Sequence, residues 1–221
     1  MMWMINNYQN FNSFSMEKIN MMYEFFMIIM IMISLFIMYM MIILLINNFI
    51  NKMIMENQYI EIIWTLLPLM LILIMLIPSI KLLYNNNENK NSNLMIKILG
   101  NQWFWNYEYL NFNIKFNSYM MMNKKFHFNN LETNNHLILP FNYQIQMISS
   151  SLDVIHSWTI PSMNIKMDTI PNQLNSNYMI MMKPNMMFGQ CSEICGMNHS
   201  FMPIQIESIN IKNFNNWMKM Y

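Results

Sequence analysis

The sequence predicts an N-terminal transmembrane α-helical hairpin followed by an all-β sandwich or barrel. Three observations support this fold class. Two long runs without a charged residue lie before residue 81, and short apolar runs separated by Asn, Ser and Pro follow them. In addition, 55% of the 221 residues are hydrophobic and only 10% are charged. An ordinary soluble domain is less apolar and more charged, so we expect part of the chain to lie outside water.

The charge of the chain argues against one broad class of function. Its formal net charge is +1, and all 12 of its basic residues are lysine. Proteins that bind nucleic acid need a basic face to neutralise phosphates. We therefore expect no nucleic acid among the partners.

The composition also reflects the codon usage of the gene. The chain has 32 Met and 36 Asn but no Ala and no Arg, which is the pattern of A- and T-rich codons. A genetic code that reads AUA as Met, as many mitochondria do, would produce the Met excess. A Met-rich adaptable core is the alternative. It explains less, because Met lies in apolar runs and polar loops alike.

Two uncharged runs predict the membrane spans. Residues 25–46 are 22 residues long, and at about 1.5 Å per residue they can cross about 30 Å of hydrocarbon. Residues 62–80 form a run of 19 that contains Pro68 and Pro78, which membrane helices tolerate. A short polar linker joins the runs, so we expect both termini on one side. The few lysines do not indicate which side that is.

The rest of the chain predicts a β-domain. Its apolar runs have the length of strands, and turn signals separate them without a helical period. Such a pattern favours an antiparallel sandwich or barrel. We place the domain boundary between residues 84 and 85, with a hydrophilic connector at 85–93 and a closing helix at 212–221. The predicted strands are 94–100, 103–110, 136–141, 143–150, 154–161, 178–183 and 202–211.

The segment GQCSEICGMNHSFMP, residues 189–203, has the densest set of metal-binding side chains. It holds both cysteines of the chain, a histidine, an acid and a methionine, and a second histidine lies in DVIHSW, which overlaps the separate predicted strand 154–161. The candidate ligands are Cys191, Glu193, Cys195, His199, Met202 and His156.

Three interpretations of this set compete. A disulfide between Cys191 and Cys195 would close a very small loop and would leave both histidines unexplained. A structural zinc ion could take two thiolates and two imidazoles. Copper is the third: a thiolate, two imidazoles and a weak thioether on a β-sandwich form an electron-transfer site. The second cysteine favours a pair of copper ions bridged by both thiolates. Zinc stays open, because soft sulfur ligands do not reject it.

Several segments together resemble a known family. GQCSEICGMNHSFMP, DVIHSWTIPS, NQWFWNYEY and IEIIWTLLP, with the two predicted spans, are similar to subunit II of the mitochondrial cytochrome c oxidase family. The resemblance covers nearly the whole chain. It implies a helical hairpin followed by a cupredoxin-like domain, residues 85–221, that holds the dinuclear copper centre CuA. It also implies a multi-pass protein of the mitochondrial inner membrane with this domain in the intermembrane space.

The resemblance further implies a function and partners. The chain would accept electrons from cytochrome c and pass them to heme a of subunit I. Oxygen would be reduced to water at heme a3 and CuB of subunit I, coupled to proton pumping, so the oxidase activity would belong to the complex. Subunit III and membrane lipid would be further partners.

Residue roles follow from the same resemblance. His156, Cys191, Cys195, His199 and Met202 match the copper ligands. Glu193 matches a residue that offers its backbone carbonyl to copper and its carboxylate to a magnesium ion shared with subunit I. Trp103 matches an exposed tryptophan where electrons enter, and Glu61 matches a carboxylate at the mouth of a proton channel. Without the resemblance, Trp103 would be sandwich core and Glu61 an acid at a helix N-terminus.

The chain also departs from the family pattern. Phe104 lacks the hydroxyl that relatives carry, and Gln173 lies where an arginine at the subunit interface is expected. The acidic patch that attracts basic cytochrome c is reduced to Glu108, Glu132 and Asp153. We therefore expect docking that depends less on salt than in acidic relatives. His127 and His136 have no partner at ligand spacing and are expected at the surface.

Overall fold

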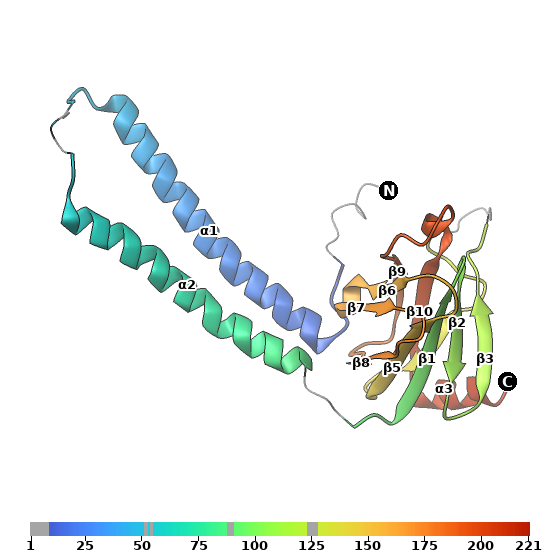
Figure 1. Ribbon diagram of the computed structural model, residues 1–221. Helices are drawn as coiled ribbons and strands as arrows, with labels where there is room; N and C mark the ends of the chain where they lie inside the picture. Colours follow the sequence, from blue (N-terminus) through green and yellow to red (C-terminus); the bar gives the residue numbers. More distant parts are fainter. Residues whose placement is uncertain (1–8, 51–52, 54, 88–90, 123–127) are drawn as a thin grey trace. The chain divides into compact units, whose positions relative to one another are not determined.

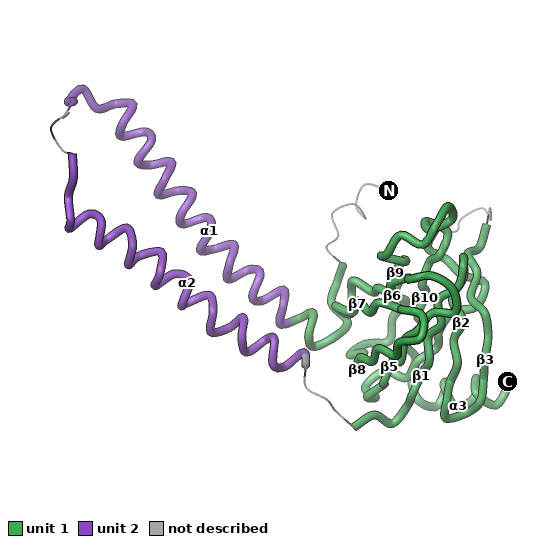
Figure 2. Tube along the Cα trace, in the orientation of Figure 1, with its two compact units in different colours: residues 1–17, 89–221 green, residues 18–88 purple. Residues whose placement is uncertain are grey.

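The computed structural model describes residues 9–50, 53, 55–87, 91–122 and 128–221. Two long helices precede two five-stranded sheets (Figure 1). The chain divides into two compact units, Lys18–Glu88 and the combination of Met1–Glu17 with Asn89–Tyr221 (Figure 2). Two apolar helices followed by a β-sandwich confirm the predicted fold class. The domain boundary between residues 84 and 85 stays a prediction.

The two helices are apolar over most of their length. Helix α1 spans Phe14–Ile46 and α2 spans Gln58–Asn87. Their most apolar windows have mean hydropathies of 3.0 and 2.6, and none of either window is buried inside the protein. Helices that are apolar all round require an apolar surrounding. Both are therefore long and apolar enough to cross a membrane, as predicted.

Three hydroxyl groups within the helices find partners on the helices themselves. The hydroxyls of Ser34, Thr65 and Ser79 donate to backbone carbonyls of their own helix at 2.8, 2.9 and 2.7 Å. An unpaired hydroxyl would be costly in hydrocarbon, so these bonds suit a membrane span. Helix α1 begins well before the predicted run, because the Ser13 hydroxyl caps it by accepting from the Met16 N–H at 3.2 Å.

The unit that contains Asn89–Tyr221 is a sandwich of two mixed sheets. One sheet has the order β3-β2-β1-β5-β8 and the other β4-β10-β9-β6-β7. The strands of the first are β1 (Leu94–Asn101), β2 (Phe104–Tyr109), β3 (Ile114–Ser118), β5 (Ile145–Ser151) and β8 (Asn175–Met179). Those of the second are β4 (Leu137–Pro140), β6 (His156–Ile160), β7 (Ile165–Thr169), β9 (Asn185–Cys191) and β10 (Pro203–Ile209). Short 3₁₀ turns, η2 (Pro161–Met163) and η3 (His199–Phe201), and the closing helix α3 (Ile211–Met218) complete it.

The sheets correct the sequence prediction in two respects. The expectation of purely antiparallel pairing is wrong for β1 with β5 and for β4 with β10, which pair in parallel. The chain passes from one sheet to the other between these strands and returns in the same direction, which local turn signals do not reveal. In addition, β3, β7 and β9 were missed, and 180–183 lies outside any strand. Asn, Lys and Met have modest strand propensity, so tertiary pairing decides these segments.

Aromatic residues fill the space between the sheets. Trp105, Tyr107 and Trp158 are fully buried. The Trp158 Nε1–H donates to the Tyr107 hydroxyl at 3.2 Å and so links the two sheets. Their polar atoms are satisfied and their rings supply the largest buried areas of the core.

The N-terminal segment packs onto the β-sandwich before α1 begins. Asn12 is only 1% exposed, and its side chain accepts from the Lys183 N–H at 2.9 Å and donates to the Lys183 carbonyl at 3.2 Å. The Ser13 hydroxyl donates to the Met163 carbonyl at 2.8 Å. These two residues therefore belong to the same unit as the sheets.

Candidate metal centre

The candidate ligands come from the ends of two neighbouring strands and the loop that follows. His156 is the first residue of β6 and Cys191 is the last residue of β9. These strands pair antiparallel, with Trp158 opposite Cys191. Cys195 lies in the loop after β9, His199 begins η3, and Met202 directly precedes β10. Strand pairing thus brings His156 to a loop far from it in the sequence.

The side chains of this set lie close together, and all but the half-buried His199 are buried. The ligand atoms of His156, Cys191 and Cys195 all lie within 4.8 Å of one another. The Cys195 Sγ is 3.5 Å from the His199 Nδ1 and 3.6 Å from the Met202 Sδ. His156 is 0% exposed, Met202 is 1% exposed, and both cysteines are buried. The structure therefore gathers all five predicted side-chain ligands.

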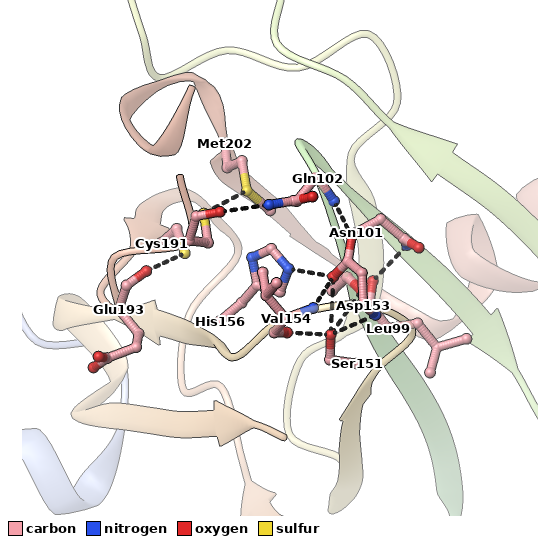
Figure 3. Close-up of polar contacts among 12 residues, drawn as sticks. Leu99, Asn101, Gln102, Ser151, Asp153, Val154, His156, Cys191, Glu193 and Met202 are labelled. Atoms are coloured by element: carbon pink, nitrogen blue, oxygen red, sulfur yellow. Dashed lines mark hydrogen bonds and ion pairs between the residues drawn. The ribbon is translucent and has the colours of Figure 1, made fainter. Parts of the chain in front are cut away.

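Glu193 approaches the cluster with its backbone carbonyl. Its carbonyl oxygen lies 3.4 Å from the Cys191 Sγ, and its side chain is exposed (Figure 3). This carbonyl is thus at the rim of the cluster, while the carboxylate points away from it. The carbonyl and the carboxylate of Glu193 therefore face different surroundings.

The ring of His156 is held by a contact between one of its nitrogens and Asp153. Its Nε2 lies 2.8 Å from the Asp153 Oδ1. Its Nδ1 is buried and has no hydrogen-bond partner among the described residues. An orphaned buried nitrogen is costly unless it binds something. A metal ion between Nδ1 and the two thiols would satisfy it, so the residues present fit a metal.

The two thiols have different electrostatic surroundings. Burial favours the neutral Cys191 thiol, but the adjacent His156 ring and hydrogen bonds with the backbone of Ser157 and Glu193 outweigh it and lower the Cys191 pKa. Burial and the neighbouring Cys191 raise the pKa of Cys195 to about 12. Two adjacent thiolates repel each other, so both become ionised together only when a cation compensates them.

The structure also bears on the competing interpretations. Both cysteines are free thiols, so no disulfide joins them in this structure. A set of two thiols, two imidazoles and a thioether suits a soft or borderline metal and excludes hard cations such as calcium. Copper and zinc both satisfy this requirement.

Trp103 lies beside the cluster, in the turn between β1 and β2. It is half-buried rather than exposed and packs against the core. Gly196, with φ +129°, lies against it: a Cβ there would be 3.2 Å from the Trp103 Cζ2. The neighbouring Gln102 donates from Nε2 to the Cys195 carbonyl at 2.9 Å. This turn is therefore in direct contact with the metal loop.

The remaining predicted residues lie elsewhere. Glu61 is in the first turn of α2, in the other compact unit. The Nε2 of His136 is 3.8 Å from a carboxylate oxygen of Glu207, and His127 lies outside the described residues. Sequence reasoning missed the contacts of Asp153 and Gln102 with the cluster. The spacing of Asp153 three residues before His156 could have suggested the first, because metal-binding histidines often pair with a carboxylate.

Comparison with known proteins agrees with this geometry. The family model "Cytochrome C oxidase subunit II, periplasmic domain" matches residues 94–209, and "Cytochrome C oxidase subunit II, transmembrane domain" matches residues 1–82. Cytochrome c oxidase subunit 2 of Lasius sp is 45% identical over 223 residues, covering 99% of this chain and 98% of the relative. The same subunit of Choristoneura rosaceana is 46% identical over 223 residues, with coverages of 99% and 98%.

A solved structure resembles the β-domain. The crystal structure of the periplasmic domain of subunit II of cytochrome oxidase of Bradyrhizobium japonicum superposes with a TM-score of 0.56 at 36% identity. The match covers 59% of this chain and 94% of that one. The β-sandwich is thus shared with a domain of known structure.

Proposed function

The chain belongs to the cytochrome c oxidase subunit II family, and from this membership we propose that it accepts electrons from cytochrome c and passes them to heme a of subunit I. Membership makes it a membrane-anchored subunit of a cytochrome c oxidase. The reduction of oxygen to water, coupled to proton pumping, is the task of the complex. Heme a3 and CuB would lie on subunit I, because two of the four histidines here are committed to the candidate centre.

One observation carries the proposal: the orphaned His156 Nδ1 is buried against two free thiols, with a second imidazole and a thioether alongside. In the proposal His156, Cys191, Cys195, His199 and Met202 hold a dinuclear copper centre, CuA, with the carbonyl of Glu193 as a further ligand. Such a centre takes up and releases one electron. The protein's part is to hold these ligands rigidly and exclude water, so that little reorganisation accompanies the transfer.

Three further roles belong to the same proposal. Electrons enter at Trp103, which is supported by the contact between its turn and the Cys195 carbonyl. The exposed carboxylate of Glu193 binds a magnesium ion shared with subunit I. Glu61, in the first turn of α2, lies at the mouth of a proton channel. In this arrangement one loop serves electron transfer on its buried side and subunit contact on its exposed side.

The proposal also places the chain in the cell. The composition points to a mitochondrial genome, and the two spans would lie in the inner membrane with the β-domain in the intermembrane space. Subunits I and III and membrane lipid are the proposed neighbours. Cytochrome c would then meet the β-domain from the aqueous side.

Metal analysis of the purified oxidase tests the function. We expect about two copper ions per subunit II beyond those of subunit I, and an electron paramagnetic resonance signal of one electron shared by two coppers. The ligand set predicts this because two thiolates can bridge two metals. A subunit that carries zinc and gives no such signal would contradict the proposal and would favour a structural metal site.

Docking of cytochrome c should depend weakly on salt. Of the acids left for a docking patch, Glu108 is already paired with Lys115 at 2.7 Å. Fewer unpaired charges give less electrostatic steering, so the rate of reduction by cytochrome c should fall less steeply with ionic strength than in acidic relatives. Stopped-flow rates over a salt series measure this. A slope as steep as that of an acidic relative would refute it.

A further inference from the structure

Asp153 is an exposed residue in the turn between β5 and β6, and its carboxylate faces His156 and the Gln102 backbone. Its Oδ1 accepts from the Val154 N–H at 2.6 Å and lies 2.8 Å from the His156 Nε2. Its Oδ2 accepts from the Gln102 N–H at 2.6 Å, and the side chain is 31% exposed (Figure 3). Both oxygens are therefore engaged by neighbouring groups.

The contact with His156 fixes which ring nitrogen can bind a metal. Each Asp153 oxygen accepts a backbone N–H, Oδ1 from Val154 and Oδ2 from Gln102, so the carboxylate faces His156 as a hydrogen-bond acceptor. An ionised carboxylate only accepts hydrogen bonds, so Nε2 carries the proton and Nδ1 keeps its lone pair. Nδ1 is the buried nitrogen without a partner in the described part of the chain. Asp153 thus orients the ring and selects its tautomer.

Asp153 is also linked to the metal centre indirectly, through Gln102. The Gln102 backbone is held by Asp153, and its side chain donates to the Cys195 carbonyl at 2.9 Å. The next residue is Trp103, which packs beside Gly196. One carboxylate therefore joins the turn that carries Trp103 to the histidine and, through Gln102, to the cysteine loop.

We propose that Asp153 is a positioning residue of the metal centre. It orients His156 and increases the electron density on the metal-binding nitrogen of that ring. It also holds the Gln102 turn against the cysteine loop. The inference rests on the proposed function, because it requires a metal at this centre. It also changes the role expected from the sequence, in which Asp153 was one of the acids offered to cytochrome c. A carboxylate behind a ligating imidazole strengthens the metal–nitrogen bond and favours the more oxidised, more positive metal.

The test is Asp153→Asn in the assembled oxidase. Asn has the same shape but no charge, and it cannot accept at both side-chain positions. We expect the reduction potential of the copper centre to rise, its absorption and paramagnetic resonance spectra to change, and its copper affinity to fall about 10- to 100-fold. The matched control is Asp168→Asn, which removes the same charge from an exposed position on β7. It should keep the wild-type potential and spectra.

A docking role would give a different pattern. If Asp153→Asn raises only the KM for cytochrome c and leaves potential, spectra and copper affinity unchanged, the proposal is wrong. If the Asn variant does not assemble, Asp153→Glu keeps the charge but moves the carboxylate: a shifted potential supports the positioning role and an unchanged one overturns it. Lack of copper in the wild-type subunit would instead refute the proposed function itself.

Discussion

Replacing Cys191 by Ser should abolish the shared-electron copper signal of the oxidase and lower its copper content. Cys191 ends β9, is buried, and lies within 4.8 Å of the ligand atoms of both His156 and Cys195. A hydroxyl is a hard, neutral ligand that cannot bridge two soft metal ions. Oxidation of cytochrome c should fall with the signal, because we propose that electrons reach heme a through this centre. Paramagnetic resonance and metal analysis of the purified complex measure both effects.

Ser192→Ala is the matched control for this variant. Ser192 is adjacent and exposed, and its backbone N–H donates to the Ser157 carbonyl at 3.0 Å. The substitution keeps that bond, so the signal and the copper content should stay at wild-type levels. Survival of the shared-electron signal in Cys191→Ser would show that the dinuclear assignment is wrong.

Gly189→Ala should destabilise the β-domain by about 3 kcal/mol or more, because its Cβ cannot be accommodated. A Cβ at this position would lie 2.0 Å from the Thr159 carbonyl oxygen, which is backbone of the neighbouring strand β6. The strands β6 and β9 would have to separate, and they carry His156 and Cys191 at their ends. A loss of this size is a large share of the about 5–15 kcal/mol by which domains are stable.

Thermal unfolding of the full chain, followed by tryptophan fluorescence, measures this loss, and metal binding should weaken in parallel. Gln190→Ala is the control on the same strand. Its exposed side chain donates to the Asn130 carbonyl at 3.2 Å, so its loss should cost about 1 kcal/mol or less. Equal stability of the two variants would mean that the strands tolerate the extra methyl group, and the close-approach explanation would fail.

The β9 strand also illustrates where prediction from sequence stops. The segment Asn185–Cys191 has no alternation of β-branched residues and contains Gly189, so local propensity did not indicate a strand. It is a strand because β10 and β6 pair with it on either side. The parallel pairing of β1 with β5 and of β4 with β10 was not indicated by local propensity either, because it depends on which sheet the chain enters next.

Within the candidate centre, the ligands that lie close together along the chain could be predicted, but the contacts that Asp153 makes could not. Cys191, Cys195, His199 and Met202 occur within one short segment, so their spacing alone suggested a shared site. From the sequence, Asp153 was predicted only as one of the three acids of the docking patch. Its role became visible when the turn after β5 placed it against both His156 and Gln102.

By itself, the sequence determined the two membrane-spanning runs, the β-rich character of the rest and the chemical types in the metal loop. Span length and ligand spacing are local properties, and local properties follow from residue identity along the chain. Only the tertiary structure decided that His156 lies beside Cys191, that Trp103 is half-buried beside the metal loop, and that Asp153 contacts both His156 and Gln102. These contacts join segments far apart in sequence, and they depend on the pairing of β6 with β9 and on the packing of the two sheets.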